Sequence, residues 1–330
     1  MNIYSGTTLT RVCKADDNSK KIIGHTKLLS QLGTRGGEGT VYKCDIENKA
    51  CKIYHKTRLD DNQRLAKLLE MQMKRLHIKG VCFPQELLYD SNGRFCGYLM
   101  DMAVGHKLQT SIMNPMVIRD KFPSWKRIDL VKVCITIINI AMELHKNNII
   151  IGDVNANNIM VKSANEVYFI DCDSFQIGKY PCPVGTPYFT PREIQGKKYS
   201  EFLRTQEHDM FAITTLIFMI LFLGKPPYSV RGGGNPAENV KNGNFPYKFN
   251  NKSGNSVPDG PWKFIWSNLT YKLKNTFNDC FSNNIKPSMY HLLKTLQGYS
   301  WAIEQGYVSN EILPTSYKKV DRAILQRYKS

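Results

Sequence analysis

Two short stretches of the chain concentrate the side chains whose types and spacing could do chemistry. Residues 149–160 read IIIGDVNANNIM and place Asp153 and Asn158 five residues apart between apolar flanks. Further along, the apolar run VYFI is followed by DCDS, which contains Asp171 and Asp173. Carboxylate and amide oxygens of this kind suit Mg²⁺, and a further carboxylate can orient or deprotonate a hydroxyl nucleophile.

Each stretch also has a simpler interpretation. Asparagine and aspartate favour turns because their side chains hydrogen-bond nearby backbone groups. DCDS alone could bind calcium, although it lacks the glycine and the distal glutamate that an EF-hand loop needs. The motifs that accompany the two stretches therefore have to decide between these interpretations.

A group of glycines lies between two β-type runs near the start of the chain. Its members are Gly33, Gly36, Gly37 and Gly39. The glycines of Rossmann and Walker motifs open a helix, so a hairpin position excludes both motifs. In a hairpin, glycines let backbone N–H groups approach phosphate oxygens closely, although any tight hairpin also favours glycine.

A lysine and a glutamate follow the glycine cluster. Lys52 stands in the strand-like run KACKIYH, where a lone lysine is usually a surface residue. Glu70 stands in LDDNQRLAKLLEMQMKRLH, whose Asp-rich start and apolar spacing predict a helix. Glu70 could pair with Lys52 and hold its ammonium group towards phosphate oxygens.

The elements that must position these residues change in kind along the chain. TKLLSQLGTRGGEGTVYKCDI predicts two strands, KACKIYH a third, and FPQELLYD and GRFCGYLMDM two more, separated by the turn SNG. After Gly105 long helices are expected in WKRIDLVKVCITIINIAMELH, WSNLTYKLKNTFNDCF and KPSMYHLLKTLQ. Residues 231–260, rich in Gly, Asn and Pro, predict a long loop or insertion.

One continuously apolar segment, MFAITTLIFMILFLG at residues 210–224, could suggest a membrane span. It is shorter than the roughly 20 residues that a helix needs to cross a bilayer. Asp209 before it and GKPPY after it are typical of a helix N-cap and a helix stop. A buried core helix is therefore expected, and no membrane partner.

Composition limits the classes of function further. The chain has 330 residues, 42% of them hydrophobic, which is enough for one large or two ordinary folded domains. The nine cysteines form no Cys-x-x-Cys pair and the start MNIYSGTTLT lacks signal-peptide features, so reduced thiols and a cytoplasmic location are expected. The formal charge of +17 is spread along the chain, which makes a nucleic-acid partner unlikely and favours a solvated surface around an anion site.

Taken in order, these motifs resemble the protein kinase signature set. GGEGTVY resembles the glycine-rich loop, ACK the strand lysine motif, GDVNANN the catalytic loop and DCD the D-F-G motif. GTPYFTPRE resembles the end of an activation segment. HDMFAITTLIF resembles the buried helix whose leading aspartate, here Asp209, braces the catalytic loop.

The resemblance implies an α+β, bilobal protein-kinase-like fold with a small β-rich N-lobe and a larger helical C-lobe. It covers roughly residues 26 to 300. The implied division of the chain is an N-terminal extension (1–25), an N-lobe (26–103), a C-lobe (104–300) and a polar C-terminal tail (301–330).

The sequence also departs from the family pattern. Ile151 and Gly152 replace the histidine and arginine before the catalytic aspartate, and Asn155 replaces the usual lysine after it. The remaining departures are Cys172 and Asp173 in place of Phe and Gly of D-F-G, Lys286 in place of a late arginine that pairs with Glu193, and Thr34 at the first loop glycine unless Gly33 serves.

GGEGTVY with D-x-D-S-F-Q resembles a bacterial branch of the eukaryotic-like (Hanks-type) Ser/Thr kinases, whose members are often encoded beside a PP2C-type phosphatase and a von Willebrand A-domain protein.

The resemblance implies a role for each candidate residue, with ATP and Mg²⁺ (or Mn²⁺) as cofactors. Asp153 would accept the proton of the acceptor hydroxyl, and Asn158 and Asp171 would hold the metal. Lys52, positioned by Glu70, would hold the α- and β-phosphates. The residues implied around the adenine are Leu32, Val41, Ala50, Met160, the gatekeeper Met100 and the hinge from Asp101 to Ala103.

Three functions compete at this point. An active Ser/Thr protein kinase is favoured, because GTPYFTPRE and the following apolar helix would shape a groove for a protein substrate. A small-molecule kinase of the aminoglycoside or choline type also lacks the arginine of the catalytic loop. A pseudokinase scaffold is the third interpretation, although no catalytic residue type is missing. Thr186 favours Ser/Thr specificity, whereas Asn155 removes the lysine typical of such enzymes.

Overall fold

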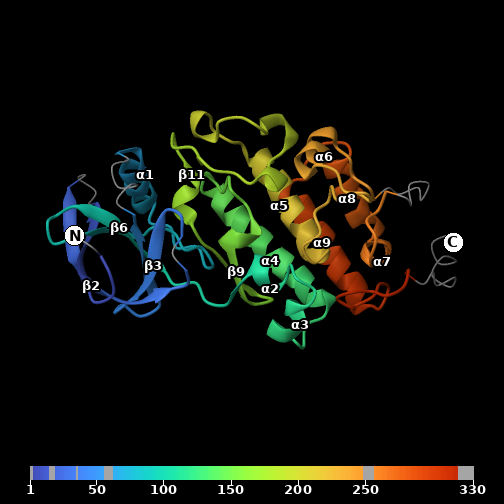
Figure 1. Ribbon diagram of the computed structural model, residues 1–330, viewed down its shortest axis with the longest axis horizontal. Helices are drawn as coiled ribbons and strands as arrows, with labels where there is room; N and C mark the ends of the chain where they lie inside the picture. The colour runs from blue at the N-terminus through green and yellow to red at the C-terminus, as the bar shows by residue number, and fades with distance from the viewer. Residues whose placement is uncertain (1–2, 15–18, 35, 56–61, 248–255, 319–330) are drawn as a thin grey trace.

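Strand-forming residues in the first hundred positions build a closed antiparallel barrel, which is the smaller of two lobes (Figure 1). The computed structural model describes residues 3–14, 19–34, 36–55, 62–247 and 256–318. The barrel strands are β1 (Thr8–Lys14), β2 (Lys20–Leu32), β3 (Gly39–Cys44), β4 (Lys49–Tyr54), β5 (Glu86–Tyr89) and β6 (Phe95–Asp101). Their order around the barrel is β1-β2-β3-β4-β6-β5, so the five expected strands are present with one more.

The additional strand, β1, closes the barrel. It pairs antiparallel with β2 on one side and with β5 on the other, where Thr10 lies opposite Tyr89. Residues 1–25 were expected to form an extension outside the N-lobe. The structure instead folds residues 8–14 and the start of β2 into the wall of that lobe.

The one helix among the described residues of this lobe, α1 (Asn62–Met73), lies beside the barrel (Figure 1). The expected helix began near residue 59, and its first residues lie outside the described part of the chain. Gln72 is buried and ties α1 to β1: its Oε1 accepts from the Lys14 N–H (2.9 Å) and its Nε2 donates to the Val12 carbonyl (3.1 Å).

The second lobe is mainly helical. Its helices are α2 (Leu108–Ser111), α3 (Val117–Lys121), α4 (Arg127–Lys146), α5 (Gln206–Leu221), α6 (Pro236–Asn242), α7 (Trp262–Ser267), α8 (Tyr271–Phe281) and α9 (Met289–Glu304). Its short strands are β7 (His106–Lys107), β8 (Ile149–Ile150), β9 (Ile159–Ser163), β10 (Glu166–Phe169) and β11 (Gln176–Ile177). In Figure 1, α4, α5 and α9 form the middle of this lobe.

The apolar segment at residues 210–224 forms most of α5, which is buried along nearly its whole length. The expected N-cap at Asp209 is wrong. Thr205 caps the helix in a reciprocal box with His208, and Asp209 lies one turn inside it. Within the described residues, no helix is long and apolar enough to cross a membrane.

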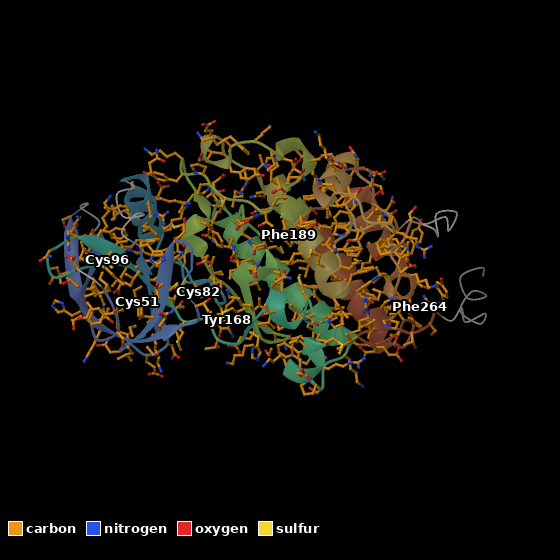
Figure 2. All side chains as sticks on the ribbon, viewed as in Figure 1. Cys51, Cys82, Cys96, Tyr168, Phe189 and Phe264 are labelled. Atoms are coloured by element: carbon orange, nitrogen blue, oxygen red, sulfur yellow. The ribbon has the colours of Figure 1, made fainter. Side chains whose placement is uncertain are left out.

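Two further expectations change in the C-terminal third. The run WSNLTYKLKNTFNDCF, expected as one helix, is divided into α7 and α8. Part of the tail packs on the lobe: buried Arg127 donates to the Ile312 carbonyl (2.9 Å), and Asn268 donates to the Ser316 carbonyl (3.1 Å). Phe264 of α7 meets Tyr317 with ring centroids 5.0 Å apart, at the end of the molecule away from the barrel (Figure 2).

The nine cysteines are all free, as expected for reduced thiols. Cys51 and Cys96 lie in the apolar interior of the barrel, and Cys82 lies where the barrel meets the helical lobe (Figure 2). The Cys82 N–H donates to the Phe169 carbonyl (2.9 Å), which joins the segment before β5 to the end of β10. This contact helps to fix the two lobes beside the acidic stretches.

Candidate functional site

The loop at residues 151–158, which we call the Asp153 loop, is positioned by Asp209. This carboxylate is 1% exposed and accepts from the Ile151 N–H (2.7 Å) and the Gly152 N–H (2.8 Å). His145 of α4 bonds the same carboxylate (2.9 Å). The expectation that Asp209 braces this loop is therefore confirmed, and because Asp209 sits on the buried α5, the loop is attached to the core.

Asp153 itself is surrounded by neutral donors. Thr186 Oγ1 donates to Oδ1 (3.0 Å), and Asn155 Nδ2 donates to Oδ2 (2.9 Å). Asn158 Nδ2 makes a longer bond to Oδ2 (3.3 Å). The carboxylate is half-buried, and among the described residues no lysine, arginine or histidine forms an ion pair with it. The hydrogen bonds from these neutral donors hold the carboxylate in one orientation.

Asn158 and Asp171 are brought together by a backbone contact. The Ile170 N–H donates to the Asn158 carbonyl (2.9 Å), so Asp171 follows directly beside Asn158. Asp171 adopts a left-handed backbone conformation (φ 56°) that is uncommon for a non-glycine residue, and its side chain is 50% exposed. The Asn158 amide nitrogen is turned to Asp153, so its amide oxygen and the half-exposed Asp171 carboxylate are the hard-oxygen donors here that could hold Mg²⁺.

Lys52 lies on β4 and is almost completely buried. Its Nζ contacts Asp173 Oδ1 (2.8 Å) and Asp171 Oδ1 (3.1 Å). The expected ion pair with Glu70 is absent from the described residues. The Glu70 carboxylate lies instead against Gly178, where a Cβ atom would come within 2.1 Å of Oε1. Asp173 occupies the place beside Lys52 because the 3₁₀ turn Cys172–Ser174 carries it into the barrel mouth.

Asp173 is buried and accepts from two phenols besides Lys52. Tyr98 donates to Oδ1 (2.9 Å) and Tyr54 donates to Oδ2 (2.6 Å). Burial alone would raise the pKa of Asp173, but the charge of Lys52 and the three hydrogen bonds lower this pKa to about 2. Burial likewise opposes the charge of Lys52, yet the two carboxylates raise its pKa above the ordinary value. Both groups are therefore charged at neutral pH.

The glycine cluster is tied to α1. Gly33, Gly36 and Gly37 lie between β2 and β3, and Gly39 begins β3. A side chain at 39 would collide with the Ile53 carbonyl (2.4 Å), so only glycine fits that position. Between these glycines, Glu38 accepts two hydrogen bonds from Arg64 of α1 (3.1 and 3.2 Å).

The residues expected around an adenine lie on neighbouring strands. Across the barrel wall, Leu32 pairs with Val41, and Ala50 pairs with Met100. Ala103 packs on the same apolar cluster, and Met160 lies in β9 directly after the Asp153 loop. The Asp101 side chain is turned to Lys49 (2.6 Å) and Gln85 (2.9 Å), so only its backbone could meet a ligand.

Comparison with known proteins gives this arrangement a family. Residues 26–296 match the family described as the protein kinase domain. The chain belongs to the protein kinase family. It is 33% identical over 225 residues to "Protein kinase YegI" of Escherichia coli K12, covering 63% of this chain and 34% of that protein.

More distant kinases match as well. The chain is 22% identical over 263 residues to "Calcium-dependent protein kinase 5" of Plasmodium berghei, covering 76% of this chain and 42% of that protein. It spans about a third of the length of the E. coli relatives it matches. The expected bilobal α+β fold and the bacterial, eukaryotic-like type of kinase are therefore confirmed.

Several residues of this kinase site were missed by sequence reasoning. Lys67 of α1 is buried and donates to the carbonyls of Ser174 (2.9 Å) and Pro181 (3.2 Å). Tyr54 and Tyr98, which hold Asp173, looked like ordinary strand residues. The one signal that could have found their partner was the second aspartate of DCD, where the kinase family has glycine.

Arg204 was also missed. It is buried beside Gly152, so that a side chain at 152 would come within 2.6 Å of its Nη1. Its Nη2 donates to the Val184 carbonyl (2.7 Å), and its backbone exchanges two hydrogen bonds with the Gln176 side chain (2.7 and 2.8 Å). Arg204 thus occupies the space that an arginine at 152 would fill. It holds residues 171–193, the activation segment of the kinase family, through the neutral Val184 carbonyl.

Proposed function

We propose that this protein is an active kinase that transfers the γ-phosphoryl group of ATP to serine or threonine hydroxyls of protein substrates. The observation that carries the proposal is the Asp153 carboxylate, which is oriented by Thr186, Asn155 and Asn158 and is paired with no cation among the described residues. A carboxylate in this state is suited to align an acceptor hydroxyl and take its proton.

The other residues supply nucleotide binding in this proposal. Mg²⁺, or Mn²⁺ in its place, would neutralise phosphate charge, and Asn158 and Asp171 would hold it. Lys52 would contact the α- and β-phosphates, and the glycine cluster would approach them with backbone N–H groups. The adenine would lie among Leu32, Val41, Ala50, Met100 and Met160, with backbone hydrogen bonds from Asp101 and Ala103.

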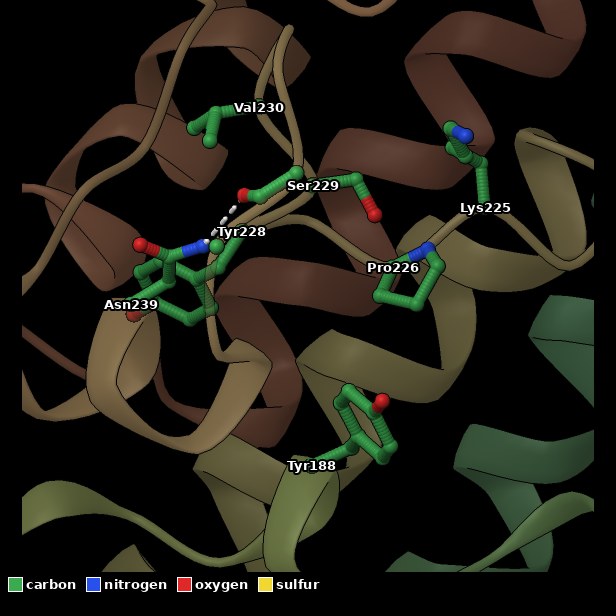
Figure 3. Close-up of a pocket in the computed structure, with 9 residues that line it drawn as sticks. Tyr188, Lys225, Pro226, Tyr228, Ser229, Val230 and Asn239 are labelled. Atoms are coloured by element: carbon green, nitrogen blue, oxygen red, sulfur yellow. Dashed lines mark hydrogen bonds between the residues drawn. The ribbon is translucent and has the colours of Figure 1, made fainter.

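A surface cavity supports a protein substrate over a small molecule. The cavity has a volume of about 150 Å³ and opens between Tyr188 of the activation segment and the loop after α5 (Figure 3). Lys225, Pro226 and Tyr228 form its other wall. Tyr188 lies two residues after Thr186, which contacts Asp153, so a chain bound here would pass close to the proposed base. A small-molecule acceptor bound at Asp153 would not extend to this cavity, so the cavity would not contribute to its binding.

The proposed partners beyond the substrate rest on the family resemblance alone. A PP2C-type phosphatase would remove phosphate that this kinase adds. A von Willebrand A-domain protein would be the second partner. A cytoplasmic location is a prediction that rests on the unpaired cysteines.

The test is incubation with labelled ATP and Mg²⁺, followed by mapping of every phosphorylated residue. Transfer to serine or threonine of protein is expected, and omission of divalent metal should abolish it. Asp171→Asn should lose transfer, whereas Asp120→Asn, an exposed aspartate on α3, should keep it. Transfer only to small molecules would favour the aminoglycoside-type alternative, and nucleotide binding without any transfer would favour a pseudokinase.

A further inference from the structure

In protein kinases generally, the strand lysine is held by a glutamate of the first helix. We propose that in this kinase Asp173 takes over that task and is the positioning residue that holds Lys52 in the phosphate-binding site. The inference rests on the proposed function for its meaning, but the ion pair can be tested without any measurement of phosphate transfer.

The barrel is built to receive the Asp173 carboxylate. Lys52 and Tyr54 are two residues apart on β4, so their side chains point to the same face. Tyr98 lies directly opposite Lys52 on β6. These three residues present an ammonium group and two hydroxyls at one point, and the distances to Asp173 are 2.6 to 2.9 Å. Both carboxylate oxygens are used, which fixes the side chain in one orientation.

In the part of the chain that the structure describes, no comparable set of donors surrounds Glu70. Its carboxylate lies beside Gly178, on the side of α1 that faces the activation segment. The helix is held in this position by Lys67, which bonds the Ser174 and Pro181 carbonyls, and by Arg64, which bonds Glu38. For Glu70 to replace Asp173, the buried aspartate would have to give up Lys52, its one ion-pair partner among the described residues, which is strongly unfavourable.

The position of Asp173 also links Lys52 to the metal site. Asp171 and Asp173 flank Cys172 in one short turn, and Lys52 touches both carboxylates. When a nucleotide binds, Asp171 can turn to the metal and Lys52 can turn to phosphate while the contact with Asp173 persists. Because Asp173, which holds Lys52, and the proposed metal ligand Asp171 belong to the same turn, a movement of α1 would not move one away from the other.

The kinetic experiment compares Asp173→Asn with Glu70→Gln, which removes only the charge in each case. With ATP varied, Asp173→Asn should lower kcat/KM by about 100-fold or more, since a displaced lysine loses phosphate contacts in the transition state. Glu70→Gln should stay within about threefold, because it alters no contact of Lys52. The reverse result, loss in Glu70→Gln and a near-normal Asp173→Asn, would overturn the proposal.

A second experiment measures the ion pair through the melting temperature. Asp173→Asn and Lys52→Met should each lower Tm by several degrees, because each strands a buried partner. The double variant should recover most of that loss, whereas Glu70→Gln combined with Lys52→Met should be additive. This cycle remains informative if Asp173→Asn alone folds poorly. Additive Tm changes for Asp173 and Lys52 would contradict the pairing.

A third measurement uses the reactivity of Lys52 in nucleotide-free protein. A small amine-acylating reagent at pH 8, with mass spectrometry of each lysine, should label Lys52 about 10-fold faster in Asp173→Asn, because the ammonium then keeps only its contact with Asp171 and loses its proton more easily. Exposed Lys43 serves as the internal reference. Equal labelling in wild type and variant would count against Asp173. If the Tm and labelling results are as expected but the wild-type protein transfers no phosphate, the proposed function is wrong and the pairing of Asp173 with Lys52 still stands.

Discussion

The Asp153 loop and the turn Cys172–Ser174 carry the same kind of side chain in two different settings. Asp153 is half-buried among amide and hydroxyl donors, and it faces no cation among the described residues. Asp173 is buried against an ammonium and two phenols, with a pKa of about 2. The first carboxylate has only neutral partners, whereas the charge and the hydrogen bonds around the second stabilise its ionised form. The charge of the partners and the access to solvent, more than residue type, therefore distinguish the carboxylate that we propose as the base from the one that we propose as a positioning residue.

The largest expected effect comes from changing Asp153, the proposed base. Asp153→Asn should lower the rate of phosphate transfer by about 10³-fold, within the range for loss of a general base, and Tm should hardly change. Its partners are neutral, so no charge is stranded. Initial rates and thermal melts of the same preparations check this. A large fall in Tm would make Asp153 a structural residue and remove the contrast with Asp173.

The support of the Asp153 loop should matter to stability nearly as much as the support of Lys52. Asp209→Ala would leave two backbone N–H groups and His145 without their acceptor. We expect a loss of about 3–5 kcal/mol in the free energy of unfolding, measured by chemical denaturation. Glu207→Ala, an exposed acid on the same helix, is the control and should stay within about 0.5 kcal/mol. Similar losses in both variants would mean that the buried acceptor has no special role.

Lys67 of α1, which bonds the Ser174 and Pro181 carbonyls, should make the stability of the protein depend on pH in the alkaline range. Burial lowers the pKa of Lys67 to about 8, whereas the unfolded chain keeps the ordinary value of 10.5. Between these values the unfolded state binds more protons, so the free energy of unfolding should rise with pH, by at most about 1.4 kcal/mol per pH unit. Lys67→Met should remove this rise, and exposed Lys43→Met should keep it. Parallel curves for all three proteins would contradict the assignment.

A smaller effect is expected at the ion pair between Glu193 and Lys286. The two residues meet at 2.6 Å, with side chains 37% and 12% exposed, so the expected pair is confirmed but its burial is partial. Lys286→Met should reduce the free energy of unfolding by about 1–2 kcal/mol, below the value for deep burial. Lys198→Met, which breaks the exposed pair with Glu201, should change it by less than about 0.5 kcal/mol. Equal changes would show that burial adds nothing at 193.

The smallest effect is expected from removing phosphate. Arg204 holds the activation segment through the Val184 carbonyl and Gln176, where many kinases use an arginine and a phosphorylated residue. Protein treated with a phosphatase should therefore transfer phosphate at an unchanged rate. Inactivity that is reversed only by phosphorylation of Ser174, Tyr180, Thr186, Tyr188 or Thr190 would show that the neutral contacts are insufficient.

The order of motifs was enough to predict the two lobes, the Asp153 loop and its brace at Asp209. The lobes, the loop and the brace came from the resemblance of these ordered motifs to the protein kinase family, whereas the spacing of apolar residues predicted only the helices and strands that carry them. The partner of Lys52 did not follow. Glu70 and Asp173 are both acids in suitable segments, and the choice between them depends on the position of α1 and on two tyrosine hydroxyls from other strands. Arg204 likewise reaches Gly152 from outside every motif.

The closure of the barrel by β1 bears on how the lobe is assembled during synthesis. β1 can pair with β2 as a hairpin as soon as both have emerged, but its other edge waits for β5, because Thr10 pairs with Tyr89. Until then a strand edge stays open, and open edges pair readily with other chains. A shortened protein that began at residue 26, where the family match starts, would keep the edges of β2 and β5 open permanently. Aggregation of such a protein on expression would then reflect a missing strand and would say nothing about its nucleotide site.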